Sequence, residues 1–308
     1  MAPRLQRLGC SPRPCGFSCR PTLPKVSSAN DRKFCDHREQ NRQRMIDTHT
    51  HSHHSPDGTG SMADMVQAAQ AIGLDGIVFT EHAEWYPGDE AYGYLDMAAY
   101  FEELNAVRSS LKDGFGVFAG VELGNPHDFP DLASSLLEKW PFDLVIGSVH
   151  WLDSMPGWQS EIFEQGLEAT YCRYFEEVIV MVENAEFDVL GHLDLVRRDS
   201  WELFGRVLDL KPYRNAIDHI LRRVIEKGKG IEVNTSGLRK GLSEPVPGLG
   251  ILRQYRSLGG EILVFGSDGH RSEHVGHGFD VARDLALAAG FERIARFEQR
   301  RVAGWIDL

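Results

Sequence analysis

The chain has 308 residues, of which 42% are hydrophobic, so it holds enough apolar material for a sizeable core. Its formal net charge of −12 argues against non-specific binding to nucleic acid or to an anionic membrane, but it does not exclude a small anionic ligand held by a few cationic side chains. No apolar run approaches the ~18 residues that are needed to cross a membrane.

The charge is distributed unevenly and marks a boundary at Met45. Residues 1–44 contain ten Lys and Arg against three Asp and Glu, whereas the remaining residues contain 23 against 42. We therefore expect 1–44 to be a disordered basic extension and 45–308 to be the folded domain; a transit-like segment and a misplaced start remain alternatives for 1–44. Residues 45–308 contain one cysteine, Cys172, which suits a reducing compartment and predicts a cytoplasmic location.

From Met45 onward, short β-rich runs alternate with longer helical patterns. The predicted strands are 45–48, 76–80, 117–122, 144–148, 189–191, 230–234 and 262–266. The predicted helices are 61–72, 95–112, 130–139, 163–184, 212–227, 248–258 and 279–289. Serial βα units of this kind indicate parallel strands with right-handed crossovers, as an open sheet or as a barrel.

The chemistry-bearing residues favour the barrel, because every predicted strand ends in a histidine or an acidic residue. In chain order the strand ends read THTHSHHSPD, TEH, GVELG, GSVHW, GHLD, EVNTSG and GSDGH. In an open sheet only the strands at the switch point share one ligand site, whereas in a barrel all carboxyl ends surround one mouth. The sequence therefore predicts an α/β fold with a closed or nearly closed barrel of seven strands.

These strand ends also predict a metal centre. Imidazoles and carboxylates together suit zinc, iron or manganese. A single tetrahedral ion uses four ligands, so the number of candidates implies more than one ion, with Glu122 as the carboxylate that bridges two of them. The candidate ligands are His49, His51, Asp57, His82, Glu122, His150, His192, Asp268 and His270.

The motifs that carry these residues resemble those of the PHP family of metal-dependent phosphoesterases. The matching stretches are DTHTHSHHSPDG, FTEHAEW, GVELG, GSVHW, GHLDLVRR and GSDGH, in family order from Asp47 to His270. The resemblance implies a distorted seven-stranded βα barrel with a trinuclear centre of divalent ions. It assigns His49, His51, Glu122 and Asp268 to the first ion, Glu122, His150 and His192 to the second, and Asp57, His82 and His270 to the third.

Within that family the chain is most similar to the histidinol-phosphate phosphatases, on the stretches GHLDLVRR, EVNTSGLRKG and SDGHRSEHVGHGF. This similarity implies hydrolysis of L-histidinol phosphate, a step of histidine biosynthesis, by a metal-bound hydroxide at a centre that includes Glu122 and Asp268. Arg197 and Arg239 lie just past predicted strands and are expected to grip the dianionic phosphate, with Ser236 as a hydrogen-bonding group. Asp194 or a metal-bound water is expected to protonate the leaving alkoxide.

Two other functions remain open at this point. The first keeps the chemistry and changes the substrate to nucleotides or oligonucleotides, as in other PHP proteins, although the acidic composition argues against it. The second is a non-catalytic PHP module, whose expected sign would be the loss of ligand residues. The identity of the metals and the oligomeric state do not follow from the sequence.

Overall fold

The computed structural model describes residues 45–111 and 114–308, and the predicted extension at 1–44 lies outside them. Seven parallel strands form one sheet in the order in which they occur in the chain, as serial βα units require. The strands are β1 (Ile46–Thr50), β2 (Gly76–Ala83), β3 (Gly116–Gly124), β4 (Leu144–Ser148), β7 (Val189–Leu190), β8 (Gly230–Asn234) and β9 (Leu263–Gly266).

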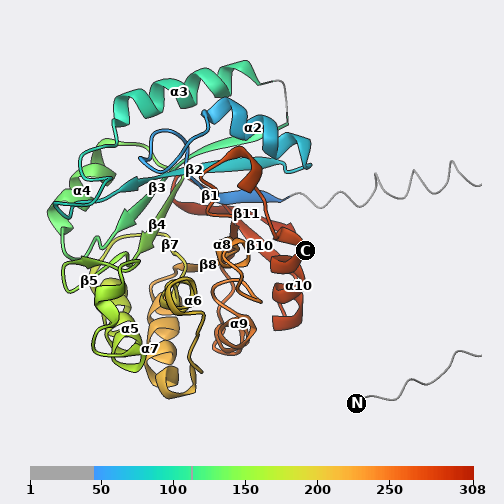
Figure 1. The fold of residues 1–308 in the computed structure, drawn as a ribbon. Coiled ribbons are helices and arrows are strands. Elements are labelled where there is room, and N and C mark those ends of the chain that lie inside the picture. The colour runs from blue at the N-terminus through green and yellow to red at the C-terminus, as the bar shows by residue number, and fades with distance from the viewer. Residues whose placement is uncertain (1–44, 112–113) are drawn as a thin grey trace, which may run out of the picture. The chain divides into compact units, whose positions relative to one another are not determined.

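The first strand also pairs with the segment that follows the last one. The backbone N–H of Asp268 donates to the carbonyl of His49 at 2.8 Å, and that of His51 donates to the carbonyl of Gly269 at 2.9 Å. The side chain of Thr48 adds a hydrogen bond to the carbonyl of Phe265. The sheet therefore curls into a nearly closed seven-stranded barrel, which confirms the predicted fold (Figure 1).

Helices surround the barrel, and local sequence explains where they start. Ser61 accepts a hydrogen bond from the N–H of Asp64, and Asp96 accepts from the N–H groups of Ala98 and Ala99, so both are N-caps. The predicted helices are present with small shifts at their ends, as α2 (Met62–Ala71), α3 (Met97–Ser110), α4 (Pro130–Lys139), α5 (Leu167–Asn184), α7 (Arg214–Glu226), α9 (Leu249–Ser257) and α10 (Phe279–Ala289). Within the described residues, no helix combines the length and the apolar character that a membrane crossing requires.

Several elements were not predicted from the sequence. They are α6 (Val196–Phe204), α8 (Ser236–Arg239), the two-residue strands β5 (Trp151–Leu152) and β6 (Met155–Pro156), the 3-10 helices η1 (Ser160–Phe163), η2 (Lys211–Tyr213) and η3 (Ser272–His274), and the hairpin of β10 (Arg293–Glu298) and β11 (Arg301–Asp307). Among them, α6 and α8 are the next elements after β7 and β8 in the chain and are labelled in Figure 1.

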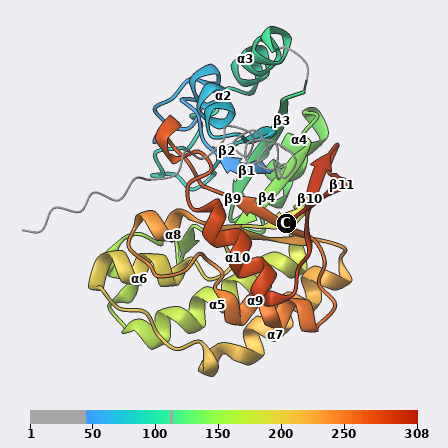
Figure 2. The same cartoon turned by 90° about the vertical axis from the view of Figure 1, so that its right-hand side faces the viewer.

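The hairpin of β10 and β11 packs against the barrel strands (Figure 2). Its Ala295 and Phe297 are buried in one apolar cluster with residues from the early parts of the barrel strands, namely Ile46, Val78, Leu144, Ile146, Val189 and Val264. Arg300, at the turn of the hairpin, forms an ion pair of 3.0 Å with Asp188, just before β7. The amino-terminal end of the barrel is thus filled by apolar side chains, and polar chemistry is confined to the carboxyl end.

Candidate metal centre

Glu122, near the end of β3, lies at the centre of the predicted site. It is buried, and the register of the two neighbouring strands pairs it with His82 of β2. Its Oε2 atom lies 3.2 Å from His49 Nε2, 3.5 Å from His51 Nε2 and 3.1 Å from His82 Nδ1. Three imidazoles from the ends of β1 and β2 therefore meet on one carboxylate oxygen.

The other oxygen of Glu122 faces a different pair of histidines. Its Oε1 atom lies 3.2 Å from His150 Nε2 and 2.8 Å from His192 Nε2, and it accepts a hydrogen bond of 2.6 Å from Ser148. A carboxylate with one oxygen directed to each of two ligand groups has the arrangement that bridges two neighbouring ions.

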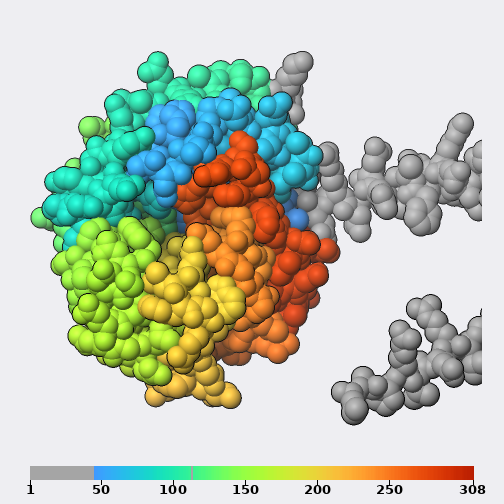
Figure 3. Space-filling view, viewed as in Figure 1, coloured from blue at the N-terminus to red at the C-terminus, as the bar shows by residue number. Residues whose placement is uncertain are grey.

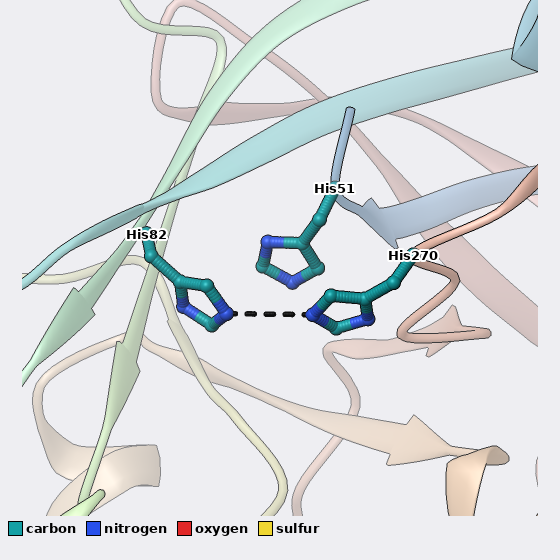
Figure 4. Close-up of side chains that lie close together, drawn as sticks. All are labelled: His51, His82 and His270. Atoms are coloured by element: carbon teal, nitrogen blue, oxygen red, sulfur yellow. Dashed lines mark hydrogen bonds between the residues drawn. The ribbon is translucent and has the colours of Figure 1, made fainter. Parts of the chain in front are cut away.

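Two further carboxylates complete the cluster on the side of β1 and β9. Asp268 Oδ1 lies 3.5 Å from His51 Nε2 and 3.6 Å from His270 Nδ1. Asp57 Oδ2 lies 2.9 Å from His270 Nε2, and its Oδ1 lies 3.7 Å from His82 Nε2. The ring of His51 stacks on those of His82 and His270, which lie on either side of it in Figure 4. The ring centroids are 4.1 and 4.2 Å apart. The structure thus brings all nine predicted ligand residues into one contiguous group.

The donor atoms in this group fit divalent cations. His49 Nε2, His51 Nε2 and His82 Nδ1 are buried, and no hydrogen-bond partner for them lies among the described residues. Leaving a buried polar atom without a partner costs about 1–3 kcal/mol, so such atoms in a functional cluster call for another partner. A cation is that partner for an imidazole lone pair, and a mixed set of nitrogen and carboxylate donors suits zinc, iron or manganese.

Buried carboxylates behind the histidines fix which ring nitrogen faces the cluster. Glu232 Oε1 lies 2.7 Å from His49 Nδ1, and Glu84 Oε1 lies 2.6 Å from His150 Nδ1. A carboxylate that holds a proton on Nδ1 leaves the lone pair on Nε2 directed at the ion and makes it more basic. Glu232 can approach only because residue 266 is glycine, since a Cβ there would lie 1.9 Å from Glu232 Oε1.

The electrostatics keep the carboxylates ionised. Burial opposes the charge of Glu122, but the nearby His49 and His150 outweigh it and hold the pKa of Glu122 well below its ordinary value. Burial lowers the pKa of His150 as well, yet Glu122 and Glu84 raise that pKa to about 10. A cation at this position competes with the proton on His150, so metal affinity is expected to fall as the pH falls.

The backbone of two ligand residues is held in an uncommon conformation. His192 has a φ of 31° and Asp268 a φ of 52°, both in the left-handed region that residues other than glycine seldom adopt. The guanidinium of Arg239 donates to the carbonyls of Ser267 and Asp268 at 2.6 and 2.7 Å and so supports the second of these turns. Strain of this kind persists where surrounding contacts fix it, and it is concentrated at functional sites.

The cluster forms the floor of a cavity of about 580 Å³. His49 and His51 are fully buried beneath it, whereas His82, His150 and Asp268 contribute to its lining. Beyond the ligands its wall contains Asp89, Glu90, Asp199, Glu202, Arg198, Lys240, Trp158, Leu195 and Leu203, among others. In the space-filling view, the blue-to-teal first third, the green-to-yellow middle and the orange-to-red last third of the described chain meet around the centre of this face (Figure 3).

Of the residues predicted to contact substrate, the structure places Arg197 and Asp194 outside this cavity. Arg197 is bound to Asp194 at 3.0 Å and to Glu244 at 2.9 Å, and it lines a separate hollow. Burial raises the pKa of Asp194, which the positive charge of Arg197 partly offsets. These two side chains form a buried ion pair at the start of α6 and do not reach the metal ligands.

The other two predicted residues act through a neighbour. Arg239 holds the backbone of the loop that carries Asp268, as described above, and does not line the cavity. Ser236 Oγ accepts a hydrogen bond of 3.0 Å from Arg198, which also contacts Asp268 Oδ2 at 3.1 Å. Arg198, one residue beyond the predicted Arg197, is therefore the arginine that lines the cavity, where Lys240 is a second cation.

Sequence reasoning did not identify Glu84, Arg198, Asp199 or Glu202 as site residues. Glu84 had a detectable signal, because it follows His82 by two residues, directly beyond the end of β2, so the alternation of the strand directs both side chains to the same side. The doublet Arg197–Arg198 offered no basis for choosing the second arginine, since the helix α6 that orients both was not predicted.

Comparisons with known proteins agree with this geometry. A family model described as the PHP domain matches residues 47–236. A histidinol-phosphatase of Lactococcus lactis is 30% identical over 83% of this chain and 96% of its own length, and a probable histidinol-phosphatase of Clostridium acetobutylicum is 28% identical over 83% and 98%.

A solved structure is similar as well. The crystal structure of histidinol phosphate phosphatase from L. lactis, complexed with zinc, L-histidinol and phosphate, superposes with a TM-score of 0.74 and 28% identity. The match covers 86% of this chain and 99% of that one. Motifs, barrel, ligand cluster and relatives all lead to one family, and the chain belongs to the PHP domain family.

Proposed function

We propose that this chain is a metal-dependent phosphatase that hydrolyses L-histidinol phosphate to L-histidinol and inorganic phosphate. The observation that carries the proposal is the position of Glu122, with five imidazoles on its two oxygens at the floor of an open cavity. The relatives named histidinol-phosphatase, which cover most of the chain, support the choice of substrate.

We further propose three divalent ions of zinc, iron or manganese. His49, His51, Glu122 and Asp268 would hold the first, Glu122, His150 and His192 the second, and Asp57, His82 and His270 the third. The contacts on each oxygen of Glu122 and on Asp57 support this division of the ligands. Ions bound there would lower the pKa of a bound water molecule and neutralise the negative charge of the phosphate.

Arg198 is proposed to bind the phosphate. It lines the cavity, and its Nη1 contacts both Asp268 and Ser236. Its buried Nε lies 3.5 Å from Asp199 Oδ1 without forming a hydrogen bond. A guanidinium held in this way offers its remaining N–H groups to phosphate oxygens in a fixed geometry.

The wall of the cavity supports a substrate whose organic part is cationic. Asp89, Glu90, Asp199 and Glu202 lie there against two cations, Arg198 and Lys240, which leaves an excess of negative charge away from the ligand cluster. L-Histidinol phosphate has its anionic phosphate at one end and an amine and an imidazole at the other. An oligonucleotide would bring further phosphates against these carboxylates, which opposes binding.

Release of inorganic phosphate from L-histidinol phosphate and from a dinucleotide, measured side by side on purified protein, tests the substrate. We expect rapid release from the first only, restored by a divalent metal after chelation, and strongly reduced in Glu122→Gln. Equal or preferential release from the dinucleotide would contradict the substrate, and an unchanged rate in Glu122→Gln would contradict the site. A cytoplasmic location and the absence of a nucleic-acid partner stay predictions.

A further inference from the structure

A second group of metal-competent side chains lies in the loop between β1 and α2 and on α3. His53 Nε2 and His54 Nε2 lie 3.1 and 2.9 Å from the same oxygen atom, Glu103 Oε2. All three donor atoms lie within 4.8 Å of one another. These residues neither line the cavity nor contact the carboxylate of Glu122, so the proposed reaction does not use them.

We propose that His53, His54 and Glu103 form an additional binding site for a divalent cation of the zinc class. Bonds of about 2.0–2.2 Å at tetrahedral angles place the ligand atoms of a zinc ion about 3.3 Å apart. The two nitrogen–oxygen separations are 3.1 and 2.9 Å, so each imidazole needs to move from Glu103 by only a few tenths of an ångström, and the two imidazole nitrogens lie within 4.8 Å of each other. Two imidazoles and one carboxylate also match the chemistry that zinc prefers.

The site is organised in advance by contacts that do not involve the donor atoms. Glu103 Oε1 accepts a hydrogen bond of 3.1 Å from the N–H of Met62, which leaves Oε2 for the histidines. The hydroxyl of Tyr94 donates to the carbonyl of His53 at 3.3 Å, and the ring of His54 packs edge-on against Tyr100. Ligands that are already held in place lose less conformational freedom when an ion binds.

The site is open to solvent on one side only. The side chain of His53 is 49% exposed, whereas that of His54 is 9% exposed. An ion can therefore reach the group from solvent, and a water molecule can take its fourth coordination position. Because the same loop carries His51 and Asp57, an ion bound here would fasten the loop to α3 and stabilise the position of two catalytic ligands.

Equilibrium dialysis against micromolar zinc, followed by elemental analysis of the metal bound per chain, tests the proposal. The parent protein is compared with His53→Gln and Glu103→Gln; in the second variant the new amide keeps an oxygen for the N–H of Met62. We expect each variant to bind about one zinc ion fewer than the parent. The zinc-dependent rise in melting temperature is expected to shrink in both variants.

His219→Gln is the matched control. His219 is 48% exposed and lies 3.0 Å from a single glutamate, Glu183, so it shares the chemistry of His53 without a second imidazole on the same oxygen. The His219→Gln variant is expected to bind as much zinc as the parent protein. Equal zinc in all four proteins, or an equal loss in the control, would overturn the proposal and leave Glu103 as an ordinary acceptor of two hydrogen bonds. Because the readout is a difference between variants, it is independent of the number of ions at the catalytic centre and of the substrate.

Discussion

Glu232→Gln isolates the contribution of a carboxylate that orients a metal ligand without belonging to the proposed ligand set. Glu232 is fully buried; its Oε1 lies 2.7 Å from His49 Nδ1, and its Oε2 accepts from the N–H of His192 at 3.2 Å and from Asn234 Nδ2 at 3.1 Å. Glutamine keeps the shape but carries one oxygen only. Whichever way the amide turns, its NH2 group faces either His49 or the two donors on the other side.

The magnitude follows from that mismatch. One buried donor without an acceptor costs about 1–3 kcal/mol, and a neutral amide polarises the imidazole less than a carboxylate does. Loss of such an orienting group commonly lowers metal affinity or activity about 10–100-fold, which corresponds to about 1.4–2.7 kcal/mol. We therefore expect kcat/KM for L-histidinol phosphate to fall by about that factor, together with weaker retention of the ion at His49.

The assay combines kinetics with metal content after dialysis against a weak chelator. Glu244→Gln is a suitable control, because Glu244 also pairs with a cation, Arg197, but lies outside the cavity. It is expected to leave kcat/KM and metal content within about twofold of the parent. The reasoning would be refuted if Glu232→Gln retained metal and rate like the parent, or if both variants lost them equally through a general loss of stability.

Three further changes have defined outcomes. In Gly266→Ala the new Cβ would lie 1.9 Å from Glu232 Oε1, so we expect a loss of bound metal larger than in Glu232→Gln, measured by elemental analysis; parent-like metal content would contradict it. Phe297→Ala, at the buried end of the barrel, is expected to lower the free energy of unfolding by about 3 kcal/mol in urea titrations, whereas Leu132→Ala, at a half-exposed position on α4, should change it much less. Burial raises the pKa of Asp199 to about 6, so the folded chain holds this proton more tightly than the unfolded chain and loses stability as the pH rises from ~4 to ~6. Asp199→Asn removes this loss and should gain about 3 kcal/mol relative to the parent between pH ~4 and pH ~7; a difference that does not vary with pH would exclude this explanation.

The barrel was predictable because its signal repeats. Seven strands in series each end in a ligand-type residue, and only a closed arrangement brings all of them together. The hairpin of β10 and β11 escaped prediction for a local reason. Its two turn residues, Gln299 and Arg300, have positive φ values of 48° and 61°. Hairpin turns of this conformation usually contain asparagine or glycine, so this turn could not be recognised from its residues.

The ligand cluster was predictable from strand position, but the substrate-facing residues were not. His49 and Glu122 both lie near the carboxyl ends of strands, in β1 and β3. Their positions could therefore be predicted from where the strands end and from the alternation of side chains along a strand. Arg198 and Arg197 are neighbours on a helix, and only the tertiary partners of each decide which one faces the cavity: Glu244 and Asp194 bind Arg197, while Asp268 and Ser236 bind Arg198.

The apolar cluster of Ala295, Phe297 and the early residues of the barrel strands closes the amino-terminal end of the barrel, so the cavity opens at the carboxyl end alone. A phosphate ester that binds with its phosphate on the floor directs its alcohol outward, so after cleavage the alcohol stands between the phosphate and bulk solvent. We therefore expect the alcohol product to depart before the inorganic phosphate, because neither product can leave through the apolar end of the barrel. The hairpin of β10 and β11 would in this way affect the order of product release without touching either product.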